Sequence, residues 1–228
     1  MTANEGTRRK KRGRGLSVPM AMRLSDWAVR FLLSAVLAGA ELMGGHAPFA
    51  LALVGVCRPG AEGFAALLGA ALGYLSFRGL IAGLRYIAAA MMVYAVTLAL
   101  GEFELYRQPW FMPGVAAVIN GVVGFVYQSA AGWGRGDWVG FATEVVLTAG
   151  SVYLFREGFD AWEKRRPGGA FSLTQGAGLL ALASALMMAL ARVTVAGDYS
   201  LGRALCVAVV AVCAWKGGVG FGAAAGVA

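Results

Sequence analysis

The segment LIAGLRYIAAAMMVYAVTLAL, residues 80–100, is 21 residues long and contains one charged side chain, Arg85. About 20 apolar residues in a helix, each rising 1.5 Å, are enough to cross the ~30 Å hydrocarbon core of a bilayer. The segment therefore predicts a transmembrane helix.

The composition of the whole chain indicates the same environment. Of its 228 residues, 59% are hydrophobic and 14% are charged, and the mean hydropathy is +0.67. A soluble domain carries about 25% charged residues, so this chain has too few charges to cover a surface in water. Similar apolar runs recur along the chain, separated by short polar clusters. The sequence predicts an all-α, polytopic transmembrane helical bundle.

About eight complete spans are expected, with a truncated ninth after them. The candidate spans are residues 28–44, 46–56, 61–77, 80–100, 110–128, 138–155, 173–193 and 201–215. The second is too short to cross a membrane and predicts a tilted, kinked or half-length segment that begins at Pro48. The final stretch, WKGGVGFGAAAGVA, contains only about half a span from Gly217 onward. Its G-x-G-x-x-A pattern lacks the strand that precedes a dinucleotide-binding turn.

The basic residues gather in two groups. Residues 1–27 form a basic tail and an interfacial segment, and residues 28–228 form the membrane domain, expected to be incomplete at its C-terminal end. We interpret the tail as a cytoplasmic flank that contacts anionic lipid rather than nucleic acid. Six intervening spans would place the second group on the same side. The two groups are Arg8, Arg9, Lys10, Lys11, Arg12 and Arg14, and Lys164, Arg165 and Arg166.

Four polar residues within or at the ends of apolar segments are candidate intramembrane sites: Glu41, Arg85, Asn120 and Glu144. An ionised group in hydrocarbon is costly unless it is paired or wetted. Arg85 is expected to extend to the headgroups, with an ion pair to Glu144 as the alternative. Asn120 predicts a hydrogen bond between helices, and Glu144 predicts either such a bond or part of a transport path. The single histidine, His46, is expected at the interface rather than as a ligand.

Glycine pairs four residues apart predict close helix packing, within the chain or between chains. They are Gly69 and Gly73, Gly79 and Gly83, Gly218 and Gly222, and Gly222 and Gly226. By contrast, no phosphate-binding loop, zinc-protease or serine-hydrolase motif is present. The three cysteines and one histidine lack the spacing of a structural zinc site. No catalytic, cofactor-binding or metal-ligating residue is therefore predicted.

Three segments follow one another in a recognisable order: GGHAPFALAL (residues 44–53), ALLGAALGYL (66–75) and GLRYIAAAMMVYAV (83–96). With the basic tail before them and the glycine-rich end after them, they resemble the N-terminal membrane region of the stage II sporulation protein E family. The resemblance covers most of the chain from about Trp27 onward. In that family about ten spans precede a cytoplasmic regulatory and oligomerising region and a metal-dependent serine/threonine phosphatase domain.

The resemblance implies a membrane-anchoring, localising and assembly region. In the family, the phosphatase activates the first forespore sigma factor, and the membrane region places it at the asymmetric septum. The implied location is the bacterial cell membrane, with the N-terminus cytoplasmic. The implied partners are lipid, further copies of the chain and cell-division proteins, but no nucleic acid.

The phosphatase chemistry is not expected in this chain. Its four aspartates, Asp26, Asp137, Asp160 and Asp198, are too dispersed for a two-metal centre. The chain is thus expected to be catalytically inert. A divalent metal, expected to be manganese, belongs only to the missing phosphatase domain. The alternative is a small secondary transporter, or the substrate-binding membrane subunit of one. Interrupted helices around a polar site near the middle of the membrane would favour that alternative.

Overall fold

The computed structural model describes residues 18–42, 45–134, 136–163, 172–195, 199–217, 223 and 226. Several residues named above lie outside these ranges, and their roles remain predictions. They are the six basic residues of the tail, the basic group at Lys164, Arg165 and Arg166, Asp198, and Gly218 and Gly222.

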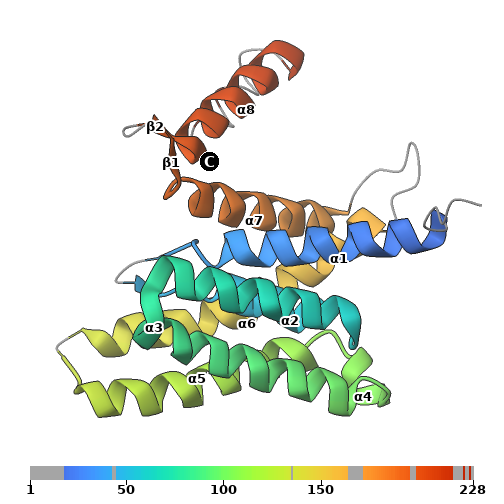
Figure 1. The fold of residues 1–228 in the computed structure, drawn as a ribbon. Helices are drawn as coiled ribbons and strands as arrows, with labels where there is room; N and C mark the ends of the chain where they lie inside the picture. Colours follow the sequence, from blue (N-terminus) through green and yellow to red (C-terminus); the bar gives the residue numbers. More distant parts are fainter. Residues whose placement is uncertain are drawn as a thin grey trace, which may run out of the picture.

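The described residues form a helical bundle with one small strand pair (Figure 1). The strands pair antiparallel, with Thr194 opposite Ser200 and Val195 opposite Tyr199. The last helix extends from the bundle beyond the helix that precedes the strands (Figure 1). In chain order the elements are α1 (Val18–Leu37), α2 (Phe49–Val56), α3 (Ala61–Leu100), α4 (Glu104–Arg107), α5 (Phe111–Ala131), α6 (Asp137–Glu163), α7 (Leu173–Leu190), β1 (Thr194–Val195), β2 (Tyr199–Ser200) and α8 (Leu201–Gly217).

Four of the described helices are long and apolar enough to cross a membrane: α3, α5, α6 and α7. The helical class is confirmed and these helices indicate a membrane protein, but eight complete spans are not supported. Three other predicted spans do not meet the length or charge requirements of a membrane-crossing helix. The 20-residue α1 carries Arg23, Asp26 and Arg30, α2 has only 8 residues, and α8 has 17.

Two of the predicted spans are arms of one helix. The 40-residue α3 is interrupted at Gly79, whose φ of 73° and ψ of −176° are not helical. Glycine adopts this conformation without the steric cost that a Cβ atom brings. Across the bend the rings of Tyr74 and Tyr86 stack with centroids 4.9 Å apart, so the arms lie side by side. Gly79 and Gly83 therefore do not form the single helix-contact face that the glycine spacing predicted. Gly79 makes the bend, and Gly83 lies against the backbone of Tyr74.

The first arm of α3 packs closely against α1. A Cβ atom added at Gly69 would overlap the carbonyl oxygen of Phe31, and one added at Gly73 would overlap that of Ala35. Glycine at these positions lets the two helices approach backbone to backbone. The contact at Gly226 is looser, because an added Cβ would lie 3.8 Å from the side chain of Val210.

The first predicted span, residues 28–44, is helical only as far as Leu37. The helix α1 starts at Val18 and runs through residue 27, where the interfacial segment was expected to end. After α1 the chain turns tightly, and the amide of Leu42 donates a hydrogen bond to the carbonyl of His46 at 2.8 Å. Gly45, with a φ of 98°, provides the left-handed conformation of this turn.

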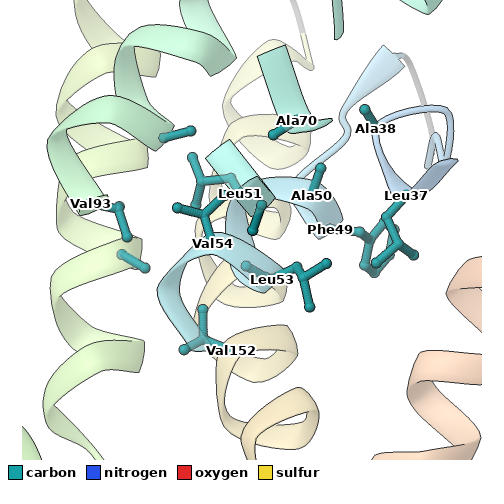
Figure 2. Packing of buried hydrophobic residues seen from close by; sticks show 14 of the residues in the cluster. Leu37, Ala38, Phe49, Ala50, Leu51, Leu53, Val54, Ala70, Val93 and Val152 are labelled. Carbon is teal, nitrogen blue, oxygen red and sulfur yellow. The ribbon is translucent and has the colours of Figure 1, made fainter. Parts of the chain in front are cut away.

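The short helix α2 lies inside the bundle. Residues Phe49–Gly55 are all buried, and α2 packs against α1, α3, α5 and α6. Figure 2 shows Leu51, Leu53 and Val54 in this core, with Val93 of α3 and Val152 of α6 beside them. Eight residues rise about 12 Å, less than half of the hydrocarbon thickness. This segment is the half-length element among the sequence alternatives, and it begins immediately after Pro48.

Candidate functional site

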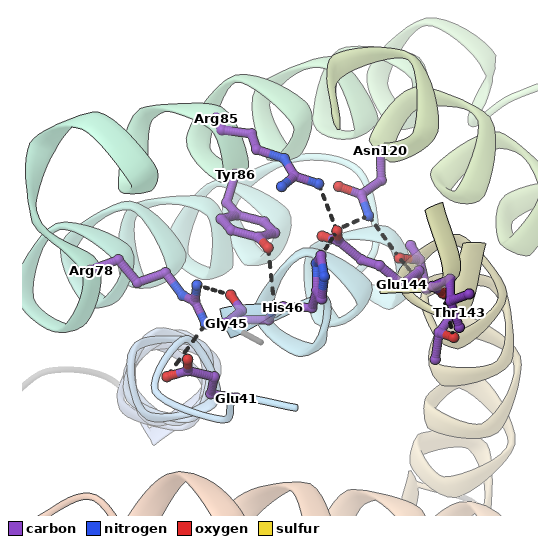
Figure 3. A network of polar contacts seen from close by, with 12 residues as sticks. Glu41, Gly45, His46, Arg78, Arg85, Tyr86, Asn120, Thr143 and Glu144 are labelled. Atoms are coloured by element: carbon purple, nitrogen blue, oxygen red, sulfur yellow. Dashed lines mark hydrogen bonds and ion pairs between the residues drawn. The ribbon is translucent and has the colours of Figure 1, made fainter. Parts of the chain in front are cut away.

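The loop that leads into α2 is fixed by two tyrosines of α3. The hydroxyl of Tyr74 donates to the carbonyl of Ala47 at 2.7 Å and accepts from the amide of Leu51 at 3.1 Å. The hydroxyl of Tyr86 accepts from the amide of Ala47 at 3.2 Å (Figure 3). Non-helical backbone within a membrane domain needs partners of this kind, because no bulk water is present to satisfy it. The two arms of α3 thus determine where the loop lies.

The loop brings His46 to Glu144, a fully buried carboxylate on α6. One carboxylate oxygen, Oε2, lies 2.6 Å from Nδ1 of His46 and 2.6 Å from Nη2 of Arg85 on α3. The other, Oε1, accepts a longer hydrogen bond of 3.4 Å from Nδ2 of Asn120 on α5. Asn120 also donates to Oγ1 of Thr148 at 2.9 Å. We call these five residues the Glu144 cluster; Figure 3 shows Arg85, Asn120, Glu144 and His46 converging from α3, α5, α6 and the loop.

The charge of Glu144 is balanced by Arg85, whose side chain is only 9% exposed. The guanidinium carbon of Arg85 also lies 4.9 Å from the ring centroid of Tyr86 and 5.8 Å from that of Tyr127. These distances allow cation–π attraction, which is stronger away from water. A buried carboxylate without such partners would cost several kcal/mol. With a neutral His46, the Glu144 cluster carries no net charge.

The structure corrects one expectation about this site. Arg85 does not extend to the headgroups but points inward and pairs with Glu144, the alternative arrangement. Gly124 of α5 makes room for it, since an added Cβ there would lie 2.6 Å from Nη2 of Arg85. His46, expected at the interface rather than as a ligand, has a side chain that is 22% exposed and bonded to Glu144, a partner that was not predicted. Asn120 is buried and makes the expected hydrogen bonds between helices.

Glu41 belongs to a separate ion-pair group. Its carboxylate pairs with Arg192, which follows α7, and lies 3.8 Å from Nη2 of Arg78 on α3. Arg78 also donates to the carbonyl of Gly45 and lies 5.1 Å from the ring centroid of Tyr86. Of the four candidate intramembrane residues, the structure therefore brings together Arg85, Asn120 and Glu144, and places Glu41 at the other side of the loop (Figure 3).

A cavity of about 350 Å³ adjoins the Glu144 cluster. It runs along one face of α6, where Asp137, Gly140 and Glu144 recur at helical spacing, and His46 and Leu42 line its other side. Near Asp137 the rings of Trp133 and Trp138 stack with centroids 3.9 Å apart. Tryptophan is enriched at membrane–water interfaces, which indicates that this end of α6 lies near one surface.

A second, smaller cavity of about 150 Å³ lies at the other end of α2, beside Gly55 and Val56. Glu163 lines it and is held by Nη2 of Arg30 at 2.7 Å and Nη2 of Arg58 at 2.8 Å. Next to it, burial raises the pKa of the Cys57 thiol from 9.0 to about 11, against the opposing effect of Arg30. The short helix thus has a charged group near each end.

The pairing of His46 with Glu144 and the anchoring by Tyr74 and Tyr86 were not predicted. The available signal was that an intramembrane carboxylate needs a cationic partner, which Arg85 and His46 could supply. Among the described residues, no group of three or more histidine, cysteine or acidic side chains could hold a metal ion. No family model, curated protein or solved structure matches the chain.

Proposed function

We propose that the chain is the membrane-anchoring and assembly region of a protein similar to stage II sporulation protein E. One observation carries this proposal: the three segments behind the resemblance form a single packed unit. The described part of the first segment, residues 45–53, supplies the loop and most of α2, and residues 66–75 and 83–96 lie in the two arms of α3. Tyr74 and Tyr86, one from each arm, both bond Ala47 of the first segment. These hydrogen bonds among the three segments support the resemblance more specifically than their shared apolar composition does.

The proposed mechanism is confinement to one membrane. Four apolar helices hold the chain in the bilayer, and a cytoplasmic domain joined to it would reach a higher effective concentration there. Close contacts such as those at Gly69 and Gly73 show that the helices pack with little space between them. In this proposal the chain carries out no catalysis. A phosphatase domain, with its divalent metal, would act from the cytoplasmic side, where the basic tail would also lie.

Localisation in a spore-forming bacterium tests the proposal. The chain is fused to a fluorescent protein and followed by microscopy through asymmetric division, beside an unrelated polytopic domain with the same fluorophore. The proposal expects fluorescence concentrated at the asymmetric septum, while the control labels the whole membrane. Uniform membrane fluorescence from both fusions would refute septal targeting, and cytoplasmic fluorescence would refute anchoring.

A transport function is the second candidate, favoured by one specific observation. The short helix α2, which does not cross the membrane, begins near a buried charge pair, Arg85 and Glu144, next to a cavity. Broken helices around charged sites are typical of secondary transporters. Proteoliposomes with a trapped pH-sensitive dye and an imposed pH gradient test for proton-coupled flux. Transport predicts faster proton entry with the unmodified chain than with Glu144→Gln. Equal rates would rule out a proton path through Glu144.

A further inference from the structure

The two nitrogen atoms of the His46 ring face different surroundings. Nδ1 lies 2.6 Å from Oε2 of Glu144, and an ionised carboxylate only accepts hydrogen bonds. Nδ1 therefore carries the hydrogen, and Nε2 of the neutral ring keeps its lone pair. Nε2 lies against α6, where a Cβ atom added at Gly140 would be 2.8 Å away. Gly140 and His46 both line the 350 Å³ cavity.

We propose that Nε2 of His46 is a proton-binding site reached through this cavity. The proton is taken from water in the cavity onto the lone pair of Nε2, while the other hydrogen stays on Nδ1 and is donated to Oε2 of Glu144. The cavity is lined along α6 from Asp137 to Leu147, and its stretch from Asp137 to Glu144 covers seven residues, or about 10 Å at 1.5 Å per residue. Asp137 is held near the outer end by Nε2 of Gln128 at 2.8 Å and the amide of Gly134 at 2.7 Å.

Proton binding changes the charge balance of the buried site. Two cations, His46 and Arg85, then share the single oxygen Oε2 of Glu144, each at 2.6 Å. The cluster gains one positive charge, so the bond from Arg85 must compete with a stronger one from His46. The charged and titratable groups around His46 come from each packed element: Glu41 from the loop, Arg78, Arg85, Tyr74 and Tyr86 from α3, Tyr127 from α5, Asp137 and Glu144 from α6, and Arg192 after α7.

The proposal is independent of septal localisation and of transport, because it concerns binding of a proton and not its passage. It separates His46 from a histidine that is sealed inside the bundle. An imidazole that no water reaches would keep the same protonation state at Nε2 when the pH of the surrounding water changes. A proton-binding imidazole changes only at Nε2 and retains its Nδ1 hydrogen throughout.

His46 is the single histidine of the chain, so an imidazole labelled with ¹⁵N reports on this site alone. The labelled chain is placed in nanodiscs and its nitrogen shifts are recorded from about pH 4 to pH 9, a range that brackets ordinary imidazole titration. The expected high-pH form has hydrogen on Nδ1 only, and Nε2 alone moves to a protonated shift as the pH falls. An Nε2 signal that is constant over the whole range, or hydrogen on Nε2 at high pH, would overturn the proposal.

The route is tested with a matched pair of glycines on α6. Alanine at Gly140 would press against Nε2 of His46, whereas a Cβ at Gly150 meets nothing within 4 Å. Diethylpyrocarbonate, which acylates unprotonated imidazole, should modify His46 about tenfold more slowly in Gly140→Ala than in the parent. Gly150→Ala should react at the parent rate, and His46→Gln gives the background. An unchanged rate in Gly140→Ala would exclude the cavity as the route, even if His46 titrates.

Discussion

Nη2 of Arg85 and Oε2 of Glu144 lie 2.6 Å apart and join the second arm of α3 to α6. Removing one member of a buried ion pair leaves the other without compensation, at a cost of about 3–5 kcal/mol. We therefore predict that Glu144→Gln lowers the unfolding free energy of the purified chain in detergent by about this amount. The exposed residue Glu102 provides the control, and Glu102→Gln should change stability by less than about 0.5 kcal/mol.

A double-mutant cycle separates this pair from general disruption. Arg85→Gln together with Glu144→Gln removes both charges and should cost clearly less than the sum of the two single variants. Strict additivity would show that Arg85 and Glu144 do not depend on each other, and the interpretation of the pair would then fail.

The space that Gly124 leaves for Arg85 gives a second prediction. A Cβ at Gly124 would lie 2.6 Å from Nη2 of Arg85 and 3.1 Å from Cε2 of Phe141, whereas one at Gly114 on the same helix meets nothing within 4 Å. Alanine in place of glycine stabilises an open helical position by up to about 1 kcal/mol, but overpacking costs about 1–3 kcal/mol. Gly124→Ala should thus be less stable than Gly114→Ala by about 1–3 kcal/mol in thermal unfolding.

The same comparison has an internal check. In a Glu144→Gln background Arg85 is no longer held in place, so Gly124→Ala should lose most of its effect. If the two glycine variants behave alike in both backgrounds, the close approach of Gly124 to Arg85 has no energetic role.

The sequence predicted those features of the fold that depend on neighbouring residues. Apolar length identified α5, α6 and α7 as candidate spans, and the two arms of α3 as two separate ones. The bend of α3 at Gly79 was not predicted, because Gly79 was expected to form a helix-packing face with Gly83. The short segment that begins at Pro48 was recognised because residues 46–56 are too few to cross the bilayer, and its helix has only 8 residues. The number of complete spans was overestimated because hydropathy alone does not weigh the charges of α1 or the early end of that helix at Leu37.

The partners of Glu144 depend on the tertiary fold. His46 is 98 residues away in the chain and Arg85 is 59 residues away, so no local pattern connects them. An isolated arginine in an apolar segment fits both a headgroup contact and a buried pair. The choice between them depends on the bend at Gly79, which determines the direction of the second arm. The sequence could name the candidate residues but not the cluster they form.

The hydroxyl of Tyr74 supports the start of α2, which gives a third prediction. It donates to the carbonyl of Ala47 and accepts from the amide of Leu51, one of the first amides of a helix, which lack partners within the helix. Tyr74→Phe removes both bonds and should lower the unfolding free energy by about 1–3 kcal/mol, measured in detergent. Tyr153→Phe alters a partly exposed ring on α6 and should have no measurable effect. Equal stability of the two variants would contradict the role assigned to Tyr74.

Cys57 gives a fourth prediction, which depends on pH. Burial raises the pKa of its thiol from 9.0 to about 11, and because the thiolate is the nucleophile, this lowers the reactive fraction near neutral pH by about 100-fold. Two variants, each with one cysteine retained, compare buried Cys57 with exposed Cys206 by maleimide labelling in detergent. Cys57 should react at least about 100-fold more slowly at pH 8.

The pKa of the Cys57 thiol is higher in the folded chain than in the unfolded chain. The stability that the neutral thiol contributes is therefore complete below pH 9 and is lost as the pH rises through about 11. Labelling of Cys57 should accelerate over the same range, because the thiolate then forms. Comparable labelling rates at pH 8 would show that the thiol is not enclosed as the structure describes.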